Sequence, residues 1–538
     1  MLSTMQDVPL QIRRIMEHGL NRHSTATVDT AEPGGLRTST FAEIGAGAAR
    51  LAHALKELGT GDGDRVATFM WNNAEHLEVY LAAPSMGAVL HPLNIRLPGD
   101  QVVFIANHAE DTVVVVDNSL LPLFAPLLPR METVRHVIVN GPGELDAPEG
   151  VTVHDYATLL EGRPATYDWP DLDERQAAAM CYTSGTTGDP KGVVYSHRSI
   201  YLHTLSLVAP DVFDLSFRDK VLAIVPQFHV LSWGLPYAAF LTGCSLSMPD
   251  RFLTPEPLAG FVKASRPNKG AGVPTVWQGL LGYVKATPDA DISSLTSAVI
   301  GGSACPPVLM DAYDEMGITL LHAWGMTEMS PLGSLARPPR GADADAVRAH
   351  RLTQGRFIAS VESRLIGPDG SVLPNDGASV GELEVRGPWI TASYYRADDP
   401  EKFHDGWLRT GDVGHISPDG YLTLTDRAKD VIKSGGEWIS SVELENHLMA
   451  HPAVAEAAVV GVPDEKWGER PLAAVVLRPG MTADYAELRD FLGGEIARWQ
   501  LPERWTTVPE IPKTSVGKFD KKVIRNQAAQ GLLDIKKI

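Results

Sequence analysis

Residues 182–192 are a polar, glycine-rich stretch between two short apolar runs, and this stretch constrains the fold more than any other. The apolar runs cover residues 177–181 and 193–195. Such runs on both sides of a glycine cluster are typical of two strands joined by a loop. Three glycines let the backbone approach a ligand closely, and four hydroxyl side chains and Lys191 add donors and a positive charge. The loop is therefore suited to binding a polyphosphate.

Two other interpretations of this loop are a Walker A loop and a flexible surface hairpin. A Walker A loop needs Gly, four residues, Gly, and then Lys followed by Ser or Thr. Here Pro190 precedes Lys191 and Gly192 follows it, which does not fit that spacing. The β-branched run that comes next does not favour the helix N-terminus on which the Walker design depends. A P-loop NTPase is therefore disfavoured, whereas a flexible surface hairpin stays open on composition alone.

Five further motifs follow the loop along the chain. They are residues 324–328 (aromatic-Gly-x-Thr-Glu), 381–383 with 394–395, 407–412, 426–430 and 512–518. In this order the six motifs resemble those of the adenylate-forming superfamily, which includes acyl-CoA synthetases, luciferases and adenylation domains. Residues 228–234, 272–277 and 433–441 look most like fatty-acyl-CoA synthetases. The last of these segments is also similar to the medium-chain and methylthiopropionate-CoA ligase branch.

The resemblance implies an ATP- and Mg²⁺-dependent fatty-acid–CoA ligase. Such an enzyme joins a small-molecule carboxylic acid to ATP, giving acyl-AMP and pyrophosphate, and then transfers the acyl group to coenzyme A. Four alternatives stay open: an acyl-AMP ligase that loads a carrier protein, a CoA ligase for a short thioether or aryl acid, a luciferase-like oxygenase, and a regulator without activity. The fatty-acyl type motifs disfavour the oxygenase, and the intact motif residues disfavour the regulator.

The resemblance also implies a set of nucleotide and metal contacts. Glu328 and Thr183 are the expected magnesium ligands, since Mg²⁺ prefers carboxylate oxygens beside phosphates. Trp324 stands where the family more often has tyrosine, so stacking on adenine is retained but a phenol hydrogen bond is not. The expected ATP-binding residues are Thr183, Ser184, Gly185, Thr186, Thr187, Gly188, Lys191, Gly301, Gly302, Ser303, Trp324, Gly325, Met326, Thr327, Asp412 and Arg427.

Other residues are assigned to catalysis, to the acid and to coenzyme A by the same resemblance. The expected catalytic residues are Lys518, Glu328, His229 and Lys433, although a lysine among four between residues 513 and 522 would by itself indicate only a basic surface tail. Lys429 is the expected hinge. The acyl pocket is expected at His229, Trp233, Gly234, Val273 and Trp277, and the coenzyme A step at Lys433, Gly435, Gly436 and Trp438.

Hydrophobic periodicity predicts the scaffold around these motifs. Residues 40–43 have a capping-box pattern, and apolar residues at steps of three and four up to Leu58 predict a helix. Residues 65–69 predict a strand, and the apolar runs at 113–116 and 136–139 are typical of parallel strands buried on both faces. Strands that alternate with helices indicate a doubly wound α/β fold.

The domain boundaries follow from changes in composition. We expect an N-terminal adenylate-forming domain over residues 1–426, built from doubly wound α/β subdomains. From about residue 354 to 425, glycine-punctuated stretches with strand alternation predict a small antiparallel, barrel-like subdomain. Residues 427–538 predict a small, mobile α+β lid domain that carries Lys518 in its last loop.

Composition limits the partners and the compartment. The chain has 538 residues, enough for two or more domains, and a formal net charge of −19, which argues against a nucleic-acid partner. Any site for ATP must therefore be a local basic island. Three scattered cysteines and no signal peptide pattern favour the reducing cytoplasm. No apolar run is long enough to span a membrane, peripheral membrane contact stays open, and relatives with this layout suggest a homodimer.

Overall fold

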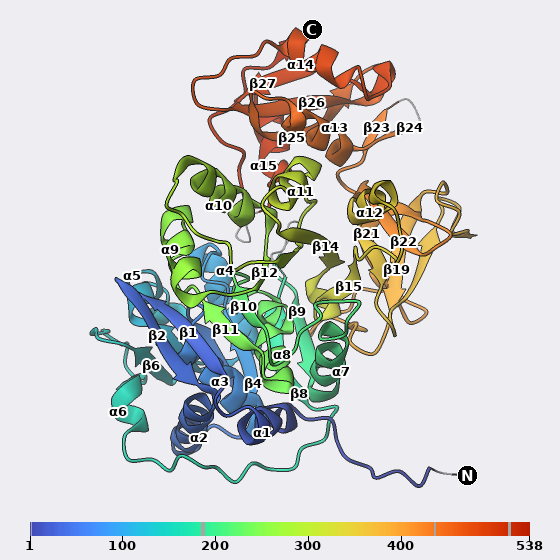
Figure 1. Ribbon diagram of the computed structural model, residues 1–538. Coiled ribbons are helices and arrows are strands. Elements are labelled where there is room, and N and C mark those ends of the chain that lie inside the picture. Colours follow the sequence, from blue (N-terminus) through green and yellow to red (C-terminus); the bar gives the residue numbers. More distant parts are fainter. Residues whose placement is uncertain (2, 184–188, 435–436, 515–517) are drawn as a thin grey trace.

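The computed structural model describes the whole chain except residues 2, 184–188, 435–436 and 515–517. A large body, which ends with β22 (Tyr421–Arg427), lies beneath a smaller part that begins with β23 (Ile432–Ser434), and we call this smaller part the lid (Figure 1). The N-terminus lies at the far end of the body from the lid, and the C-terminus lies at the top of the lid. Among the described residues, no helix combines the length and the apolar character that crossing a membrane requires.

The first layer of the body is a sheet of seven strands among the described residues. All neighbouring strands are parallel except the last two, which are antiparallel and flank the polyphosphate loop as predicted. In spatial order the strands are β7 (Thr152–Asp155), β6 (His136–Asn140), β5 (Asp111–Asp117), β3 (Arg65–Phe69), β4 (Val89–Pro92), β8 (Ala177–Tyr182) and β9 (Gly192–Ser196). The helices of this part are α2 (Phe41–Glu57), α3 (Ala74–Ser85), α4 (Gly99–Ala109), α5 (Leu121–Phe124) and α6 (Tyr156–Leu160).

Local sequence explains why these elements form where they do. The Thr40 side chain accepts a hydrogen bond from the Glu43 N–H, and the Glu43 carboxylate accepts one from the Thr40 N–H, so the predicted capping box begins α2. The valines of β5 are fully buried, as expected for a strand covered on both faces.

A second sheet joins a parallel part to an antiparallel part. Its parallel part and the hairpin at its edge contain β14 (Thr319–Gly325), β13 (Ser297–Ile300), β12 (Lys269–Gly272), β10 (Lys220–Ala223), β11 (Ser245–Met248), β1 (Thr27–Glu32) and β2 (Gly35–Thr40). The helices of this part are α1 (Ile12–Arg22), α7 (His197–Leu207), α8 (Leu235–Thr242), α9 (Pro255–Ser265), α10 (Pro274–Ala286) and α11 (Pro307–Asp314). Helix α12 (Ala344–Arg351) lies in the chain between the first two strands of the antiparallel part.

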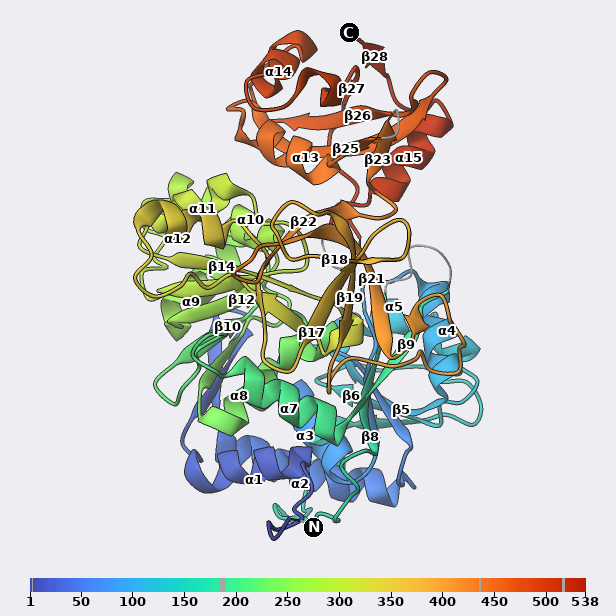
Figure 2. The same cartoon turned by 90° about the vertical axis from the view of Figure 1, so that its right-hand side faces the viewer.

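Most of the antiparallel part falls within residues 354–425, for which a barrel-like subdomain is predicted, and we call this part the barrel-like region. It contains β15 (Leu332–Leu335), β16 (Gly355–Phe357), β22, β21 (Trp407–Ile416), β19 (Gly381–Arg386), β17 (Glu362–Ile366) and β18 (Val372–Leu373), and β20 (Phe403–His404) pairs with β21. Its strands lie at the right-hand side of the body in Figure 1, and Figure 2 shows them facing the viewer below the lid and rising toward the boundary between body and lid. This region therefore delivers residues of β21 and β22 to the boundary.

The lid has its own mixed sheet and its own hydrophobic cores. Its strands are β23, β24 (Glu437–Ile439), β25 (Val454–Asp464), β26 (Gly468–Leu477), β27 (Arg504–Thr507) and β28 (Lys536–Lys537), and its helices are α13 (Ser441–Ala450), α14 (Tyr485–Leu492) and α15 (Lys521–Ala529). Trp505, Leu444 and Val459 are fully or almost fully buried in one of these cores, which contains only lid residues. The lid is thus a packed unit of its own.

Candidate active site

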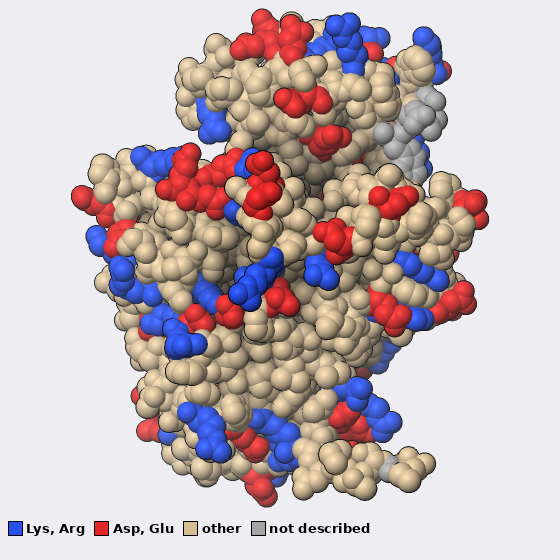
Figure 3. All heavy atoms as spheres, turned by 45° about the vertical axis from the view of Figure 1, so that its right-hand side comes forward, with Lys and Arg blue, Asp and Glu red and all other residues tan. Residues whose placement is uncertain are grey.

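The predicted nucleotide residues gather where the parallel strands β13 and β14 end, close to the antiparallel strands β21 and β22. Ligands of open α/β sheets bind at the carboxyl ends of the strands. The lid lies above this edge, next to α10 and α11 (Figure 1). On the face shown in Figure 3, the surface is indented along the boundary between body and lid, and basic and acidic side chains are interspersed around it.

The base of the polyphosphate loop is closed by two hydrogen bonds between Thr183 and Lys191. The Thr183 N–H donates to the Lys191 carbonyl oxygen at 2.9 Å, and the Lys191 N–H donates to Thr183 Oγ1 at 3.2 Å. Lys191 Nζ lies 2.5 Å from Asp399 Oδ2 and 4.8 Å from the centroid of the Tyr394 ring. The hydrogen bond from Lys191 is the main cause of the lowered pKa of Asp399. Residues 184–188, which carry five of the predicted contacts, lie outside the described residues.

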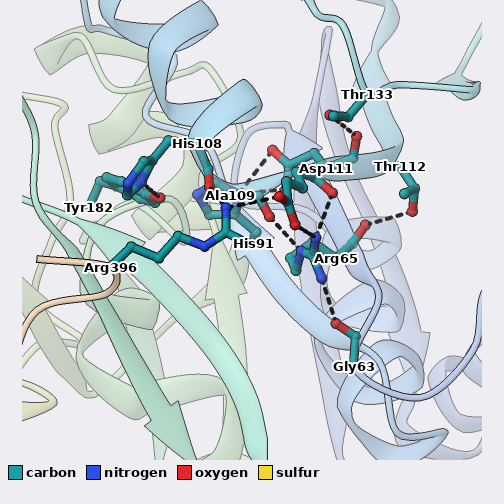
Figure 4. A network of polar contacts seen from close by, with 11 residues as sticks. Gly63, Arg65, His91, His108, Ala109, Asp111, Thr112, Thr133, Tyr182 and Arg396 are labelled. Carbon is teal, nitrogen blue, oxygen red and sulfur yellow. Dashed lines mark hydrogen bonds and ion pairs between the residues drawn. The ribbon is translucent and has the colours of Figure 1, made fainter.

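A network of polar contacts positions the strand that leads into this loop (Figure 4). The Tyr182 hydroxyl lies 2.7 Å from Nδ1 of His108, and the carbonyl oxygen of His108 accepts from Arg396 Nη1 at 3.3 Å. On the other side of the Tyr182 ring, His91 is paired with Asp111 through its Nδ1 at 2.8 Å, and both are fully buried. The end of β8 is therefore fixed by residues of β4, β5 and α4 and by a segment of the barrel-like region.

Trp324 and Asp412 are in direct contact. The indole N–H donates to Asp412 Oδ2 at 2.8 Å, and Arg427 Nε lies 3.5 Å from Asp412 Oδ1. Trp324 is buried, and one side of its ring occupies the space that a Cβ on Gly333 would need. The indole N–H thus engages one carboxylate oxygen of Asp412, and the other oxygen lies beside Arg427. The roles of these residues in binding the nucleotide stay predictions.

The motif after Trp324 is held by its own turn. A Cβ on Gly325 would lie 2.0 Å from the Pro331 carbonyl oxygen, so only glycine fits, and the same oxygen accepts from the Met326 N–H at 3.1 Å. A tyrosine of β9 donates to the carbonyl oxygen of Thr327 at 2.7 Å. Glu328 is only 5 % exposed, which is unusual for a carboxylate and requires hydrogen bonding. It is therefore no solvated surface charge.

Two glycines after β13 leave room for the neighbouring side chains. A Cβ on Gly301 would lie 3.2 Å from Cη2 of Trp233. Gly302 has φ = +87°, a conformation that L-residues with a Cβ rarely adopt, and its Cβ position lies 3.6 Å from Cε of Lys518. Ser303, which follows, is half-buried. The structure thus brings the lid lysine to the glycine turn of the body.

Lys518 lies among the charged residues of the predicted nucleotide site. The pKa of Lys518 is lowered to about 8, mainly by burial and also by the charge of Arg427, although Asp412 and Glu328 act in the opposite direction. The Lys518 N–H donates to Thr514 Oγ1 at 3.2 Å. An exposed basic tail would not show these effects, so that interpretation of Lys518 is wrong.

The predicted acyl residues have different environments. His229 is half-buried, and burial together with the charge of Lys518 lowers its pKa to about 3, so the imidazole is neutral. Val273 Cγ1 lies 3.4 Å from the Cβ position of Gly302, on the same side of the site. Trp277 is fully buried in a core cluster, where its ring fills the space beside two glycines of β12. The roles of all three in an acyl pocket stay predictions.

Trp233 is placed by a left-handed turn. Val230, Leu231, Ser232 and Trp233 have φ between 46° and 54°, and Gly234 has φ = 79°. Each such residue with a Cβ costs roughly 1–2 kcal/mol, so the surrounding packing must enforce the turn. The hydroxyl of Ser232 donates to the Val225 carbonyl oxygen at 2.7 Å, and a Cβ on Gly234 would lie 2.9 Å from His203 Cε1. The turn directs Trp233 toward the glycine turn after β13.

The residues predicted for the hinge and the coenzyme A step lie in the lid or at its start. Burial lowers the pKa of Lys429. Lys433 is exposed, and its backbone N–H donates to Glu469 Oε2 at 2.9 Å. Residues 435–436 and the side chain of Trp438 lie outside the described residues. This part of the predicted site stays a prediction.

Three residues of the site were not singled out from the sequence. Tyr394 donates its hydroxyl hydrogen to Glu328 Oε1 at 2.6 Å, and Asp399 holds Lys191. Lys402 donates to the Thr410 carbonyl oxygen at 3.3 Å, burial lowers its pKa, and Glu328 is among the charges that act on it. Tyr394 belongs to a recognised motif and was within reach of the sequence; the other two follow it in a stretch without a motif.

A separate cavity of about 450 Å³ lies at the opposite, amino-terminal edge of the parallel strands. Lys269, Arg337 and Arg351 line it, but each of them donates to backbone carbonyl oxygens. Their charges are thus engaged by the protein itself, and the cavity is assigned no ligand.

Comparison with known proteins agrees with this geometry. The family model of the AMP-binding enzyme matches residues 18–395, and that of the AMP-binding enzyme C-terminal domain matches residues 443–518. The chain belongs to the AMP-binding enzyme family. A 3-methylmercaptopropionyl-CoA ligase from Ruegeria pomeroyi is 44% identical to this AMP-binding enzyme over 98% of the chain and 99% of the relative.

Two further similarities span the whole AMP-binding enzyme. A medium-chain-fatty-acid–CoA ligase from Ectopseudomonas oleovorans is 40% identical over 99% of this chain and 98% of the relative. The crystal structure of the anthranilate CoA ligase AuaEII with anthranoyl-AMP superposes with a TM-score of 0.87 at 25% identity, covering 98% of this chain and 100% of that one. The predicted superfamily, the two-part α/β fold and the predicted class of enzyme, an ATP-dependent acid–thiol ligase, are confirmed.

Proposed function

We propose that this chain is a fatty-acid–CoA ligase that activates its acid as an acyl-adenylate. The observation that carries the proposal is the meeting of Lys518 from the lid with Glu328 and Asp412 from the body at one place. A lysine, a lone carboxylate and a ribose acceptor are the groups that adenylation of a carboxylate needs. The names of the curated relatives, both acid–CoA ligases, support the same chemistry.

ATP binds across the body in this proposal. The ribose hydroxyls are held by Asp412, whose second oxygen is already fixed by Trp324, and by Arg427 beside it. The adenine lies against the glycine turn of Gly301 and Gly302 and beside Trp324. The polyphosphate lies along the loop between β8 and β9, which offers Lys191 and the hydroxyl of Thr183.

The residues present also fit Mg²⁺. Magnesium in nucleotide sites is usually bound by one or two carboxylates together with phosphate oxygens and water. Glu328 is a single buried carboxylate next to the polyphosphate loop, so it suits a metal that arrives with ATP. Glu328 and Thr183 would hold the ion. When bound, it would neutralise charge on the β- and γ-phosphates.

Lys518 acts in the first half-reaction. An oxygen of the substrate carboxylate attacks the α-phosphorus, the bond to the oxygen that bridges the α- and β-phosphorus breaks, and pyrophosphate leaves with that electron pair. The two reactants are both anions, so a positive charge between them stabilises the transition state. The side chain of Lys518, whose Cε lies 3.6 Å from the Cβ position of Gly302, would bring its ammonium to that position from the lid side. In this proposal, adenylation takes place with the lid in the orientation described above.

The second half-reaction requires the lid to move. We propose that residues 427–538 rotate about Lys429 against residues 1–426, which withdraws Lys518 and opens a path for coenzyme A. Its thiolate then attacks the acyl carbonyl carbon, and AMP leaves with the electrons of the carbon–oxygen bond. Lys433, Gly435, Gly436 and Trp438 are the residues proposed for this step. The separate core of the lid supports a rigid-body rotation.

The acid is proposed to be aliphatic. One relative is named as a ligase of a short thioether acid and another as a ligase of medium-chain fatty acids. His229, Trp233 and Val273 border the Lys518 side of the site and are the proposed start of the acyl pocket. Because His229 is neutral, its imidazole adds no charge that would oppose an alkyl chain. A short thioether acid such as methylthiopropionate stays the main alternative to a fatty acid.

We also propose a cytoplasmic homodimer. The three cysteines, Cys181, Cys244 and Cys305, are buried free thiols, which suits a reducing compartment. The dimer rests on the resemblance to relatives of this layout. Sedimentation velocity at micromolar concentration tests it, and a monomer across the tested range would contradict it.

The deciding experiment measures pyrophosphate release, AMP and acyl-CoA for a series of acids from propionate and methylthiopropionate to palmitate, with and without coenzyme A. Thioester formation on one part of the series is the expected result, and it identifies the acid. Adenylate without thioester on every acid would favour the acyl-AMP ligase that loads a carrier protein. Absence of pyrophosphate release with every acid would contradict the proposed function.

A further inference from the structure

Tyr394 contacts both charged groups of the metal and polyphosphate end of the site. Its hydroxyl donates to Glu328 Oε1 at 2.6 Å, and its ring face lies 4.8 Å from Lys191 Nζ. The side chain is 6 % exposed. One aromatic residue thus lies between the proposed metal ligand, on the turn after β14, and the lysine of the polyphosphate loop, which is far away in the sequence.

The backbone around Tyr394 is fixed to the same two segments. The Tyr395 N–H donates to the Gly192 carbonyl oxygen at 2.8 Å, at the end of the polyphosphate loop. The Thr391 N–H donates to the Glu328 carbonyl oxygen at 2.8 Å. On its other side, the Tyr394 ring makes an edge contact with Phe403, with centroids 5.1 Å apart. The position of the ring is therefore determined on all sides.

The hydroxyl also selects which Glu328 oxygen stays available. Oε1 accepts the hydrogen bond from Tyr394, and none of the described residues donates to Oε2. A donor to one oxygen holds the carboxylate in one rotamer, and the negative charge strengthens that hydrogen bond. The other oxygen would then be left for a cation, without competition from a donor among the described residues.

We propose that Tyr394 is a positioning residue that orients Glu328 for Mg²⁺ and keeps Lys191 at a fixed place beside it. The proposal deepens the proposed function and rests on it. Tyr394 touches neither the acid nor coenzyme A in this arrangement. Its effect is confined to the binding of the metal and polyphosphate, which precedes both half-reactions.

Three variants separate the two contacts of Tyr394. Tyr394→Phe removes the donor to Glu328 and keeps the ring beneath Lys191. Tyr394→Leu removes both. Tyr395→Phe is the matched control, because it deletes the same atom from the next residue and no described residue bonds to that hydroxyl.

The test is calorimetric titration of ATP into the full-length protein, without acid or coenzyme A, in EDTA and over a series of Mg²⁺ concentrations. For Tyr394→Phe we expect the Mg²⁺ concentration at half-maximal ATP binding to rise about tenfold, as loss of a hydrogen bond to a charged group predicts. ATP affinity in EDTA should equal that of the wild type. Tyr394→Leu should weaken ATP binding in EDTA as well, and Tyr395→Phe should match the wild type throughout.

Each other outcome overturns a defined part of the proposal. If the wild type binds Mg-ATP and Tyr394→Phe needs no more Mg²⁺, Tyr394 does not orient Glu328, although the proposed function stands. If Tyr394→Phe loses affinity equally in EDTA and in Mg²⁺, the residue only supports the local fold. If the wild type binds no ATP, the proposed function and this inference are both wrong.

Discussion

The body and the lid contribute to the site in different ways. In the body, the functional side chains are joined in pairs: Trp324 with Asp412, Tyr394 with Glu328 and Lys191 with Asp399. In the lid, Lys518 reaches the same site, but none of the described residues accepts a hydrogen bond from its Nζ. The paired side chains of the body therefore hold one another in place before any ligand binds, whereas the positive charge of Lys518 can move away together with the lid.

The interface between the body and the lid is also compatible with a lid that moves. The Ser441 N–H donates to Asp426 Oδ2 at 2.8 Å, and Gln278 Nε2 donates to the Ala455 carbonyl oxygen at 3.3 Å. The lid has its own hydrophobic cores, so rotation would break polar contacts and would not open a core. Polar interfaces of this kind permit domain motion. A two-step reaction needs such an arrangement, because one group must be present in the first step and absent in the second.

Loss of the lid charge gives the largest expected effect. Lys518→Ala should slow pyrophosphate release about 100-fold to 1,000-fold, the usual cost of removing one preorganised group that stabilises transition-state charge. Thioester formation from supplied acyl-AMP should change little, because Lys518 is withdrawn in that step. Stopped assays of pyrophosphate and acyl-CoA measure the two steps separately.

The control for this variant is Lys513→Ala. Lys513 precedes the same loop, but it pairs with Glu456 inside the lid at 2.6 Å, so both half-reactions should keep the wild-type rate. Equal losses of both half-reactions in Lys518→Ala would contradict the division of labour between body and lid.

A pH profile of adenylation also tests the role of the lid charge, and we expect a change in kcat/KM of about tenfold. The pKa of Lys518 is lowered to about 8, so its charge is present below pH 8 and is lost as the pH rises. Because kcat/KM reports the free enzyme, kcat/KM for pyrophosphate release without coenzyme A should fall about tenfold per pH unit above 8. Lys518→Arg should remove this decline, since arginine keeps its charge. A decline that persists in Lys518→Arg would assign it to another group.

The sequence predicted the local features of this molecule well. The capping box of α2 and the two strands around the polyphosphate loop depend on neighbouring residues, and both are found in the structure. The pairing of Trp324 with Asp412 joins residues 88 positions apart, and no pattern in either segment predicts this contact. Glu328 was recognised from its motif, but its partner Tyr394 depends on how the barrel-like region meets β14 and β9.

The left-handed turn at residues 230–234 is a local feature that the sequence did not predict. Gly234 alone signals a positive φ, whereas Val230 and Leu231 have side chains that disfavour it. Tertiary packing overrides local preference there. The orientation of Trp233, and with it the shape of the proposed acyl pocket, was therefore beyond reach of the sequence.

The smallest expected effect concerns the pairing of Lys191 with Asp399 in the body. This ion pair is partly exposed, so it contributes only about 0–1 kcal/mol. If Lys191 must leave Asp399 to bind the polyphosphate, Asp399→Asn should tighten ATP binding by up to about fivefold, which titration calorimetry measures. Asp398→Asn, at the exposed neighbouring residue, is the control and should leave affinity unchanged. Weaker ATP binding by Asp399→Asn would mean that Asp399 stays paired with Lys191 and orients it. The body would then be preorganised even at its exposed edge, and only the lid would supply a group that changes partner.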